Sequence, residues 1–276
     1  MSETIKILGV RFDKVSTKEA LEKAISLAKD KHQHYICTPN PEILLAAQNN
    51  PKYLDVLNHS DLSIADGIGI LWASKFEKIT EHNKKNLGIF AKWLSSLSSI
   101  LFYPKYIRTE LAERVTGTDL MQDICKEGAH ENLKVFLLGA AEGVAEKVKI
   151  ILEKKHPGIK IVGTFAGSAS QEDEDDIIKR INKTDAQILF IAYGAPAQEF
   201  WISRNLKKLN TVKLAIGIGG AFDYIAGIRK RAPKLLQKLG AEWLYRLIQQ
   251  PSRIKRIFNA TVKFPVKILN KRLKQI

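Results

Sequence analysis

The chain has 276 residues, of which 45% are hydrophobic and 26% are charged, and its formal net charge is +15. This composition fits a globular protein with one large domain, or with one domain and an appendage. Two cysteines provide neither a disulfide framework nor a zinc site, which fits a reducing compartment. Because the N-terminus lacks an apolar signal core and no run is long and apolar enough to span a bilayer, we expect neither a secreted nor an integral membrane protein.

The first part of the chain alternates between short strands and helices. Ser16-Thr-Lys-Glu19 is a capping box that opens a helix, and Pro41 suits the first position of another. In chain order we expect a strand and turn at 5–12, a helix from 16 to about 30, a strand at 35–38, a helix at 42–48, a strand at 62–65 and a helix at 71–76.

Polar side chains follow two of these strands. Thr38 and Asn40 lie beside a helix N-terminus, where free amide groups favour anions. Asn40 as a simple helix cap explains the same pattern equally well. Asp66 leaves an apolar strand and enters a Gly-x-Gly turn, so its carboxylate lies at the sheet edge where open α/β proteins bind ligands. An Asp that only caps the next turn is the alternative.

Segment 77–111 is expected to be an insertion, and its stretch 87–103 is amphipathic. On a helix, Lys92 and the serines share one side and the large apolar residues share the other. The apolar set is Phe90, Trp93, Leu94, Leu97, Ile100 and Leu101. Three roles remain open for this stretch: packing on the body, lying in a membrane interface, or joining copies of the chain in a homo-oligomer.

From Lys134 onward, apolar strands alternate regularly with amphipathic helices. Strands are expected at 134–139, 159–163, 186–192 and 213–217, and helices at 144–155, 172–182 and 198–208. The pattern predicts an α/β, Rossmann-like fold, with a mostly parallel sheet covered by helices on both faces.

Three of these strands run into glycine turns, at Gly139, Gly194 and Gly219. Backbone amides at such turns are suited to the phosphates of a nucleotide. The glycine spacing after Gly139 departs from the dinucleotide fingerprint, and the sequence contains no P-loop, so NAD-dependent oxidoreductases and P-loop NTPases are disfavoured. The histidines show no spacing typical of metal ligands.

The positive charge is concentrated at the C-terminus. From Arg229 onward there are fourteen Lys or Arg residues and one acidic residue, Glu242, whereas the rest of the chain is nearly neutral. We therefore divide the chain into an α/β body at 1–230 and a basic helical appendage at 231–276, which Pro251 and Pro265 break into short helices. Such a tail predicts an anionic membrane surface or nucleic acid as partner, and its few aromatic residues disfavour nucleic acid.

An ordered set of motifs covers the chain from Ile5 to Arg256 and resembles the WecG/TagA/CpsF glycosyltransferase family. The motifs are Thr38-Pro-Asn-Pro-Glu42, Asp66-Gly-Ile-Gly69, Glu113-Arg-Val-Thr-Gly117, Gly194-Ala-Pro-Ala-Gln-Glu199, Gly217-Ile-Gly-Gly-Ala-Phe-Asp223, Arg231-Ala-Pro233, Gly240-Ala-Glu-Trp-Leu-Tyr-Arg246 and Gln250-Pro-Ser-Arg-Ile-Lys-Arg256.

The resemblance implies a bacterial enzyme that moves an N-acetylmannosamine-type sugar, with inversion, from a UDP donor to a polyprenyl-diphosphate-linked N-acetylglucosamine. Its product would enter a cell-surface polymer, either teichoic acid or polysaccharide. A different UDP-hexose donor is the alternative within the family, and a basic nucleic-acid-binding protein is the alternative outside it. The resemblance further implies a cytoplasmic protein associated peripherally with the inner face of the membrane, with no cofactor.

The resemblance also assigns residues. It implies a general base at Asp66 and arginines from the appendage, Arg246, Arg253 and Arg256, at the departing diphosphate. The implied substrate-binding set is Thr38, Asn40, Arg114 and Gln198, together with Gly139, Gly194 and Gly219. With no D-x-D motif we expect no metal, its place being taken by the arginines. Ala197 replaces a frequent Lys, which weakens an expected donor contact.

Overall fold

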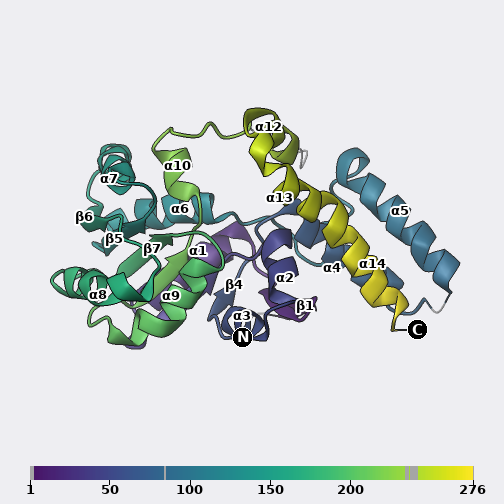
Figure 1. Cartoon of the computed structure of the whole chain (residues 1–276), viewed down its shortest axis with the longest axis horizontal. Helices are drawn as coiled ribbons and strands as arrows, with labels where there is room; N and C mark the ends of the chain where they lie inside the picture. The colour runs from purple at the N-terminus through teal and green to yellow at the C-terminus, as the bar shows by residue number, and fades with distance from the viewer. Residues whose placement is uncertain (1–2, 84, 234–235, 237–241, 276) are drawn as a thin grey trace.

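The central element is a six-stranded sheet in which all neighbouring strands are parallel (Figure 1). The computed structural model describes residues 3–83, 85–233, 236 and 242–275. The strand order is β4-β3-β8-β7-β5-β6. The strands are β3 (His34–Cys37), β4 (Leu62–Ser63), β5 (Lys134–Gly139), β6 (Lys160–Phe165), β7 (Ile188–Ala192) and β8 (Leu214–Gly217). This topology confirms the predicted α/β class.

Helices cover both faces of the sheet because side chains alternate along each strand. On β5, Leu137 joins the apolar cluster of one face, and Phe136 and Leu138 join that of the other. The first face carries α1 (Thr17–Ala28), α6 (Gly117–His130), α7 (Val144–Lys155) and α10 (Ala221–Ile225). The second carries α8 (Glu174–Asn182), preceded by the 3-10 turn η1 (Gln171–Asp173), and α9 (Ala197–Asn205), followed by η2 (Leu206–Lys208).

A third apolar cluster lies beyond the β4 edge of the sheet. Strands β1 (Thr4–Ile7) and β2 (Val10–Asp13) form an antiparallel hairpin outside the main sheet, where the sequence predicted a strand and turn. Phe12 of this hairpin packs with α2 (Pro41–Ala47), α3 (Pro51–Asn58) and α4 (Ile68–Thr80). The carboxylate of Asp13 accepts a hydrogen bond from the amide of Ser63 at 2.9 Å, which ties the hairpin to β4.

Helix α5 (Asn86–Phe102) forms about half of segment 77–111 and packs on α4. Ser96 and Ser99, from the polar side of the amphipathic pattern, are buried, whereas Phe90 and Leu94 of the apolar side are exposed. The indole Nε1 of Trp72 donates to Ser96 Oγ at 3.0 Å. The segment therefore packs on the body, one of the predicted alternatives. It packs through these two serines and through part of the predicted apolar side, since Trp93, Leu97 and Ile100 lie partly buried against the same apolar cluster as α4.

The C-terminal segment continues as a series of short helical elements. They are α12 (Glu242–Gln249), the 3-10 turn η3 (Pro251–Arg253), α13 (Ile254–Phe258), the π turn η4 (Asn259–Lys263) and α14 (Phe264–Leu273). The predicted break is confirmed at Pro251. At Pro265, which lacks an amide hydrogen, the backbone instead stays helical through the preceding π turn. Gly240 and Ala241 of the predicted motif lie outside the described residues.

The last helix belongs to the core. Phe264, Ile268 and Leu269 of α14 are buried in the same cluster as α4, and α14 passes in front of α4 with α2 on one side and α5 on the other (Figure 1). The basic C-terminal segment thus carries its arginines on a support that is packed into the body. In the part of the chain that the structure describes, no helix has both the length and the apolar character that crossing a bilayer requires.

Candidate active site

Two adjoining cavities open where β3, β4, β7 and β8 end at their carboxyl edge. One, of about 510 Å³, lies over the strand ends and the glycine turns after β7 and β8; we call it the sheet cavity. The other, of about 420 Å³, lies between α4, α5 and the C-terminal elements; we call it the tail cavity. Six residues line both cavities: Asn40, Glu42, Asp66, Arg246, Arg253 and Arg256. The boundary between the cavities therefore collects most of the charged residues that the sequence singled out.

Asp66 lies at this boundary because the chain turns sharply after β4. Its amide donates to the carbonyl of Pro39 at 3.1 Å, and Gly67 takes a φ of 144°, a conformation that favours glycine. Within the described residues, the carboxylate of Asp66 makes no hydrogen bond or ion pair, so it is available to a ligand. Burial raises the pKa of Asp66 to about 6, against the opposing charges of Arg114 and Arg246. A base with this pKa is mostly deprotonated at neutral pH.

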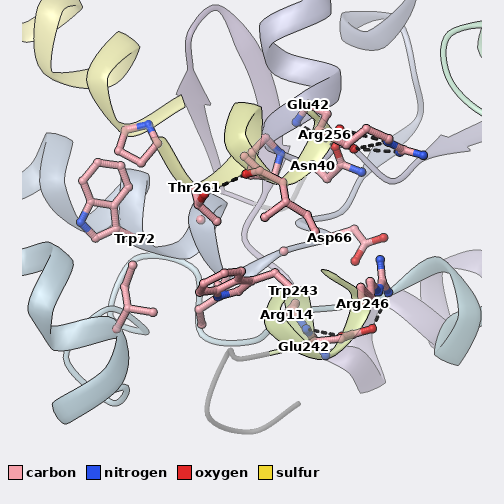
Figure 2. A pocket seen from close by; sticks show the side chains of 18 of the residues that line it. Asn40, Glu42, Asp66, Trp72, Arg114, Glu242, Trp243, Arg246, Arg256 and Thr261 are labelled. Atoms are coloured by element: carbon pink, nitrogen blue, oxygen red, sulfur yellow. Dashed lines mark hydrogen bonds and ion pairs between the residues drawn. The ribbon is translucent and has the colours of Figure 1, made fainter. Parts of the chain in front are cut away.

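Glu242 organises two of the arginines beneath Asp66 (Figure 2). Its carboxylate pairs with Arg114, with 3.0 Å between Nη1 and Oε2, and with Arg246 one turn further along α12. Burial alone would raise the pKa of Glu242, but the two guanidinium groups outweigh it and hold the pKa below its ordinary value. Arg246 also lies over the ring of Tyr224, 5.3 Å from its centroid. Glu242 thus joins the body, through Arg114, to the C-terminal helices.

The other two arginines differ in how they are held. Arg256 forms an ion pair with Glu42, with 2.8 Å between Nη2 and Oε2. Arg253 lines both cavities, and its guanidinium makes no hydrogen bond or ion pair among the described side chains. Its pKa is lowered by burial and then by the neighbouring charge of Arg256. Of the four predicted arginines, Arg253 is therefore the one free to take an anion.

Gln198 connects the two glycine turns of the sheet cavity. Its side-chain oxygen accepts hydrogen bonds from the amides of Gly194 at 3.1 Å and Gly219 at 3.0 Å. Its amide nitrogen donates to Glu199 at 2.8 Å, and the other oxygen of Glu199 accepts from the hydroxyl of Tyr53 at 3.1 Å. The two glycine amides that were predicted to meet phosphates are therefore occupied by Gln198. The positive charge for a diphosphate has to come from the arginines instead.

The remaining predicted residues are placed as follows. Thr38 is buried below the sheet cavity and donates from Oγ1 to the carbonyl of Gly217 at 3.3 Å. Asn40 lines both cavities and is also the cap of α2, accepting from the amides of Glu42 and Ile43 at 3.0 and 3.1 Å. The cap interpretation of Asn40 is confirmed, and its role toward a substrate stays a prediction. Gly139 is not among the residues that line the two cavities. A Cβ there would lie 2.9 Å from the backbone of Ala192, so close strand packing explains the glycine.

No group of three or more His, Cys, Asp and Glu side chains suited to a metal ion occurs in the described ranges 3–83, 85–233, 236 and 242–275. The charged groups that line the tail cavity are four arginines and three carboxylates, Glu42, Asp66 and Glu242. Guanidinium groups bind phosphate through paired hydrogen bonds of fixed geometry. The arrangement can thus accept a proton at one carboxylate and hold a phosphate beside it.

The chain is similar to known proteins over most of its length. The model of the glycosyl transferase WecG/TagA/CpsF family matches residues 5–90 and 98–276. The chain belongs to this family. Proteins of Staphylococcus aureus strains MRSA252, MW2 and NCTC 8325 are each 32% identical to it over 256 residues, which cover 92% of this chain and 87% of each relative. Each is named N-acetylglucosaminyldiphosphoundecaprenol N-acetyl-beta-D-mannosaminyltransferase.

The family match bears on two features of this glycosyltransferase. The match is interrupted only at 91–97, inside α5, which is shorter than the segment predicted as an insertion. It also includes the C-terminal segment, so the arginines of α12, η3 and α13 fall within the matched region. Glu242 is the site residue that sequence reasoning missed. Its position four residues before Arg246, as the one acid of a basic tail, was the available signal.

Proposed function

We propose that this glycosyltransferase moves an N-acetylmannosamine-type sugar from a UDP donor to a polyprenyl-diphosphate-linked N-acetylglucosamine. The observation that carries the proposal is the unpaired carboxylate of Asp66, with its raised pKa, at the boundary between two cavities beside the uncommitted guanidinium of Arg253. The names of the S. aureus relatives supply the sugar and the acceptor. The polymer that receives the product is a cell-surface one, teichoic acid or polysaccharide.

The two cavities divide the substrates between them. The sheet cavity, at the strand ends, takes the UDP donor, because ligands of open α/β sheets bind outside the carboxyl ends of the strands. The tail cavity takes the acceptor, because it borders Asp66 from the other side. Asp66 then faces the acceptor hydroxyl, and the arginines face the diphosphate of the donor.

This arrangement supports a single displacement with inversion. Asp66 removes the proton of the acceptor hydroxyl while that oxygen forms a bond to the anomeric carbon. The bond between the anomeric carbon and the diphosphate oxygen breaks, and its electron pair leaves with UDP. Arg253, with Arg246, stabilises the negative charge that develops on the leaving group. In this scheme the arginines provide the charge that a divalent cation supplies in other transferases, so we propose that the reaction is metal-independent.

Peripheral association with the inner face of the cell membrane follows from the acceptor and the charge. The basic tail carries thirteen net positive charges from Arg229 onward, and each Lys or Arg near an anionic leaflet contributes about 1 kcal/mol of attraction. We propose that this surface holds the protein where a lipid-linked acceptor resides. A liposome pull-down with and without anionic lipid, in parallel with an oligonucleotide, tests this choice of partner.

A donor screen tests the function directly. Purified protein is mixed with each of several UDP-sugars and a synthetic lipid-diphosphate N-acetylglucosamine, and UDP release and product mass are followed. We expect transfer with UDP-N-acetylmannosamine, an inverted anomeric configuration in the product, and activity that persists in EDTA. Transfer from a different UDP-hexose alone would assign a different donor, and no transfer from any UDP-sugar would contradict the proposal.

A further inference from the structure

The tail cavity has two chemically different ends. Figure 2 shows Asp66, Arg246 and Glu242 at one end and Trp72 and Thr261 at the other. The second end is lined mainly by apolar side chains from α4, α5 and the α13–α14 stretch. Its apolar residues include Trp72, Leu97, Ile100, Leu101, Ile257 and Pro265. A sugar would bind unfavourably at this apolar end, because its hydroxyl groups would lose their hydrogen bonds with water there.

Helix α5 is held firmly enough to act as a wall of this end. Besides the bond from Trp72 to Ser96, the indole Nε1 of Trp93 donates to the carbonyl of Pro265 at 3.1 Å. These two bonds attach α5 to α4 and to α14. The small side chains of Ser96 and Ser99 allow a close approach to the body. As a result, Leu97 and Ile100 face the α13–α14 stretch across the cavity.

The apolar end also reaches the protein surface. Leu101 lines the cavity and is 55% exposed, and Trp243 also lines it and is 38% exposed. Outside the cavity, the exposed apolar residues Ile254, Phe258, Val262 and Val266 recur every four residues along the same helical stretch. Exposed apolar surface of this extent marks a contact with lipid or with a partner. An apolar ligand can thus enter from a lipid phase and reach the arginines.

We propose that this apolar end is a passage for the first isoprene units of the acceptor, with α5 as its wall. The ligand class follows from the two ends together, since a polyprenyl diphosphate joins a branched apolar chain directly to a diphosphate. The inference rests on the proposed function and adds a binding subsite and a role for α5. Leu97, Ile100 and Ile257 therefore contact the isoprene units and make binding depend on chain length. The arginines hold the diphosphate at the boundary.

Acceptors that differ only in their chain test this inference. N-acetylglucosamine diphosphates capped with methyl, one isoprene unit or four units are assayed below their micelle concentration, without vesicles, so that membrane binding does not contribute. For the wild type we expect kcat/KM to rise at least tenfold from the methyl-capped to the four-unit acceptor. Apolar contacts in a pocket discriminate by about tenfold or more per group lost.

Ile100→Asn places an amide in the passage, and Leu94→Asn is the matched control on the exposed side of the same helix. We expect Ile100→Asn to lose about tenfold in kcat/KM on the four-unit acceptor and nothing on the methyl-capped one, and Leu94→Asn to change neither. Ala260 also lines the tail cavity. Ala260→Leu, which fills the passage with an apolar group, gives the same selective loss if Ile100→Asn folds poorly.

Three results overturn the inference. The first is a wild-type rate that does not depend on chain length, and the second is an equal loss in Leu94→Asn and Ile100→Asn. The third is a loss that is the same on the methyl-capped and four-unit acceptors. Transfer to these acceptors without any chain dependence contradicts the passage but leaves the proposed function standing. Absence of transfer to all of them, with every UDP-sugar, contradicts both.

Discussion

Asp66→Asn removes the proposed base with almost no change in side-chain volume. A positioned general base contributes about a hundredfold to ten-thousandfold to the rate, and we expect kcat/KM to fall by a factor in this range. The fold should not suffer, because the Asp66 carboxylate has no hydrogen-bond partner among the described residues. Its raised pKa means that the ionised form is disfavoured in the folded protein, so we expect a melting temperature at neutral pH that is equal to or above that of the wild type.

The pH profile gives the same prediction an independent readout. With a pKa of about 6, roughly nine-tenths of Asp66 is ionised at pH 7 and roughly one-tenth at pH 5. We expect kcat/KM of the wild type to decline below pH 6, about tenfold per pH unit, since kcat/KM reports groups of the free enzyme. UDP release is followed from pH 5 to 8, and the residual activity of Asp66→Asn should lack this acid limb.

Glu242→Gln is the control that separates Asp66 from other titrating groups. The negative charge of Glu242 contributes to raising the pKa of Asp66, so its removal should move the acid limb to lower pH. An acid limb that persists in Asp66→Asn would refute the assignment, as would wild-type turnover by that variant. UDP binding by calorimetry, expected to be nearly unchanged in Asp66→Asn, shows that the donor site is intact.

Three further predictions follow from the packing. Phe264→Ala, at a fully buried position, should lower the free energy of unfolding by about 3 to 5 kcal/mol, whereas Phe258→Ala, at a side chain 55% exposed, should change the melting temperature little. Glu199→Gln should weaken UDP binding in calorimetry without loss of fold, because the amide of Gln198 exchanges its carboxyl acceptor for an amide and holds the two glycine turns less firmly. Unchanged affinity would contradict this role. The ring nitrogens of His34 lie 2.7 Å from carboxylate oxygens of Asp30 and Asp61, and these hydrogen bonds outweigh burial and raise the pKa of His34. The stability that His34 contributes is therefore complete below about pH 6.5 and declines as pH rises through its raised pKa. Thermal melts of the wild type and His34→Gln should converge at high pH.

The sequence predicted many of the strands and helices well because their signals are local. Capping and periodicity act within a few residues, and the Ser16 capping box, the cap at Asn40 and the helix at 144–155 are all present in the structure. The position of Asp66 was predictable for the same reason, since a strand followed by Gly67 sets the turn. Topology then brings the strand ends together, which the alternating pattern already implied.

What the sequence did not predict depends on contacts between distant residues. Glu242 was counted as one acid in a basic tail, and its pairing with Arg114, 128 residues away, arises only when α12 docks on the body. On α5, the burial of Ser96 and Ser99 was not predicted, because hydrophobicity does not measure how closely two helices approach. The glycine turns were predicted to bind phosphate, but Gln198 takes their amides.

The position of α14 explains how a basic tail can serve both as a surface and as part of the site. On one side of the α13–α14 stretch, Phe264 is buried against α4; on another, Phe258 and Val262 are exposed. Because the buried side fixes the stretch, core packing helps to position the arginines before it relative to Asp66, in addition to their ion pairs with Glu42 and Glu242. A membrane that covers the exposed side would then meet the open, apolar end of the tail cavity. In the proposed arrangement, one face of this helical stretch therefore contacts the membrane, and another face helps to hold Arg253 in position. Substitutions on the exposed face should alter membrane binding without altering turnover of an acceptor in solution.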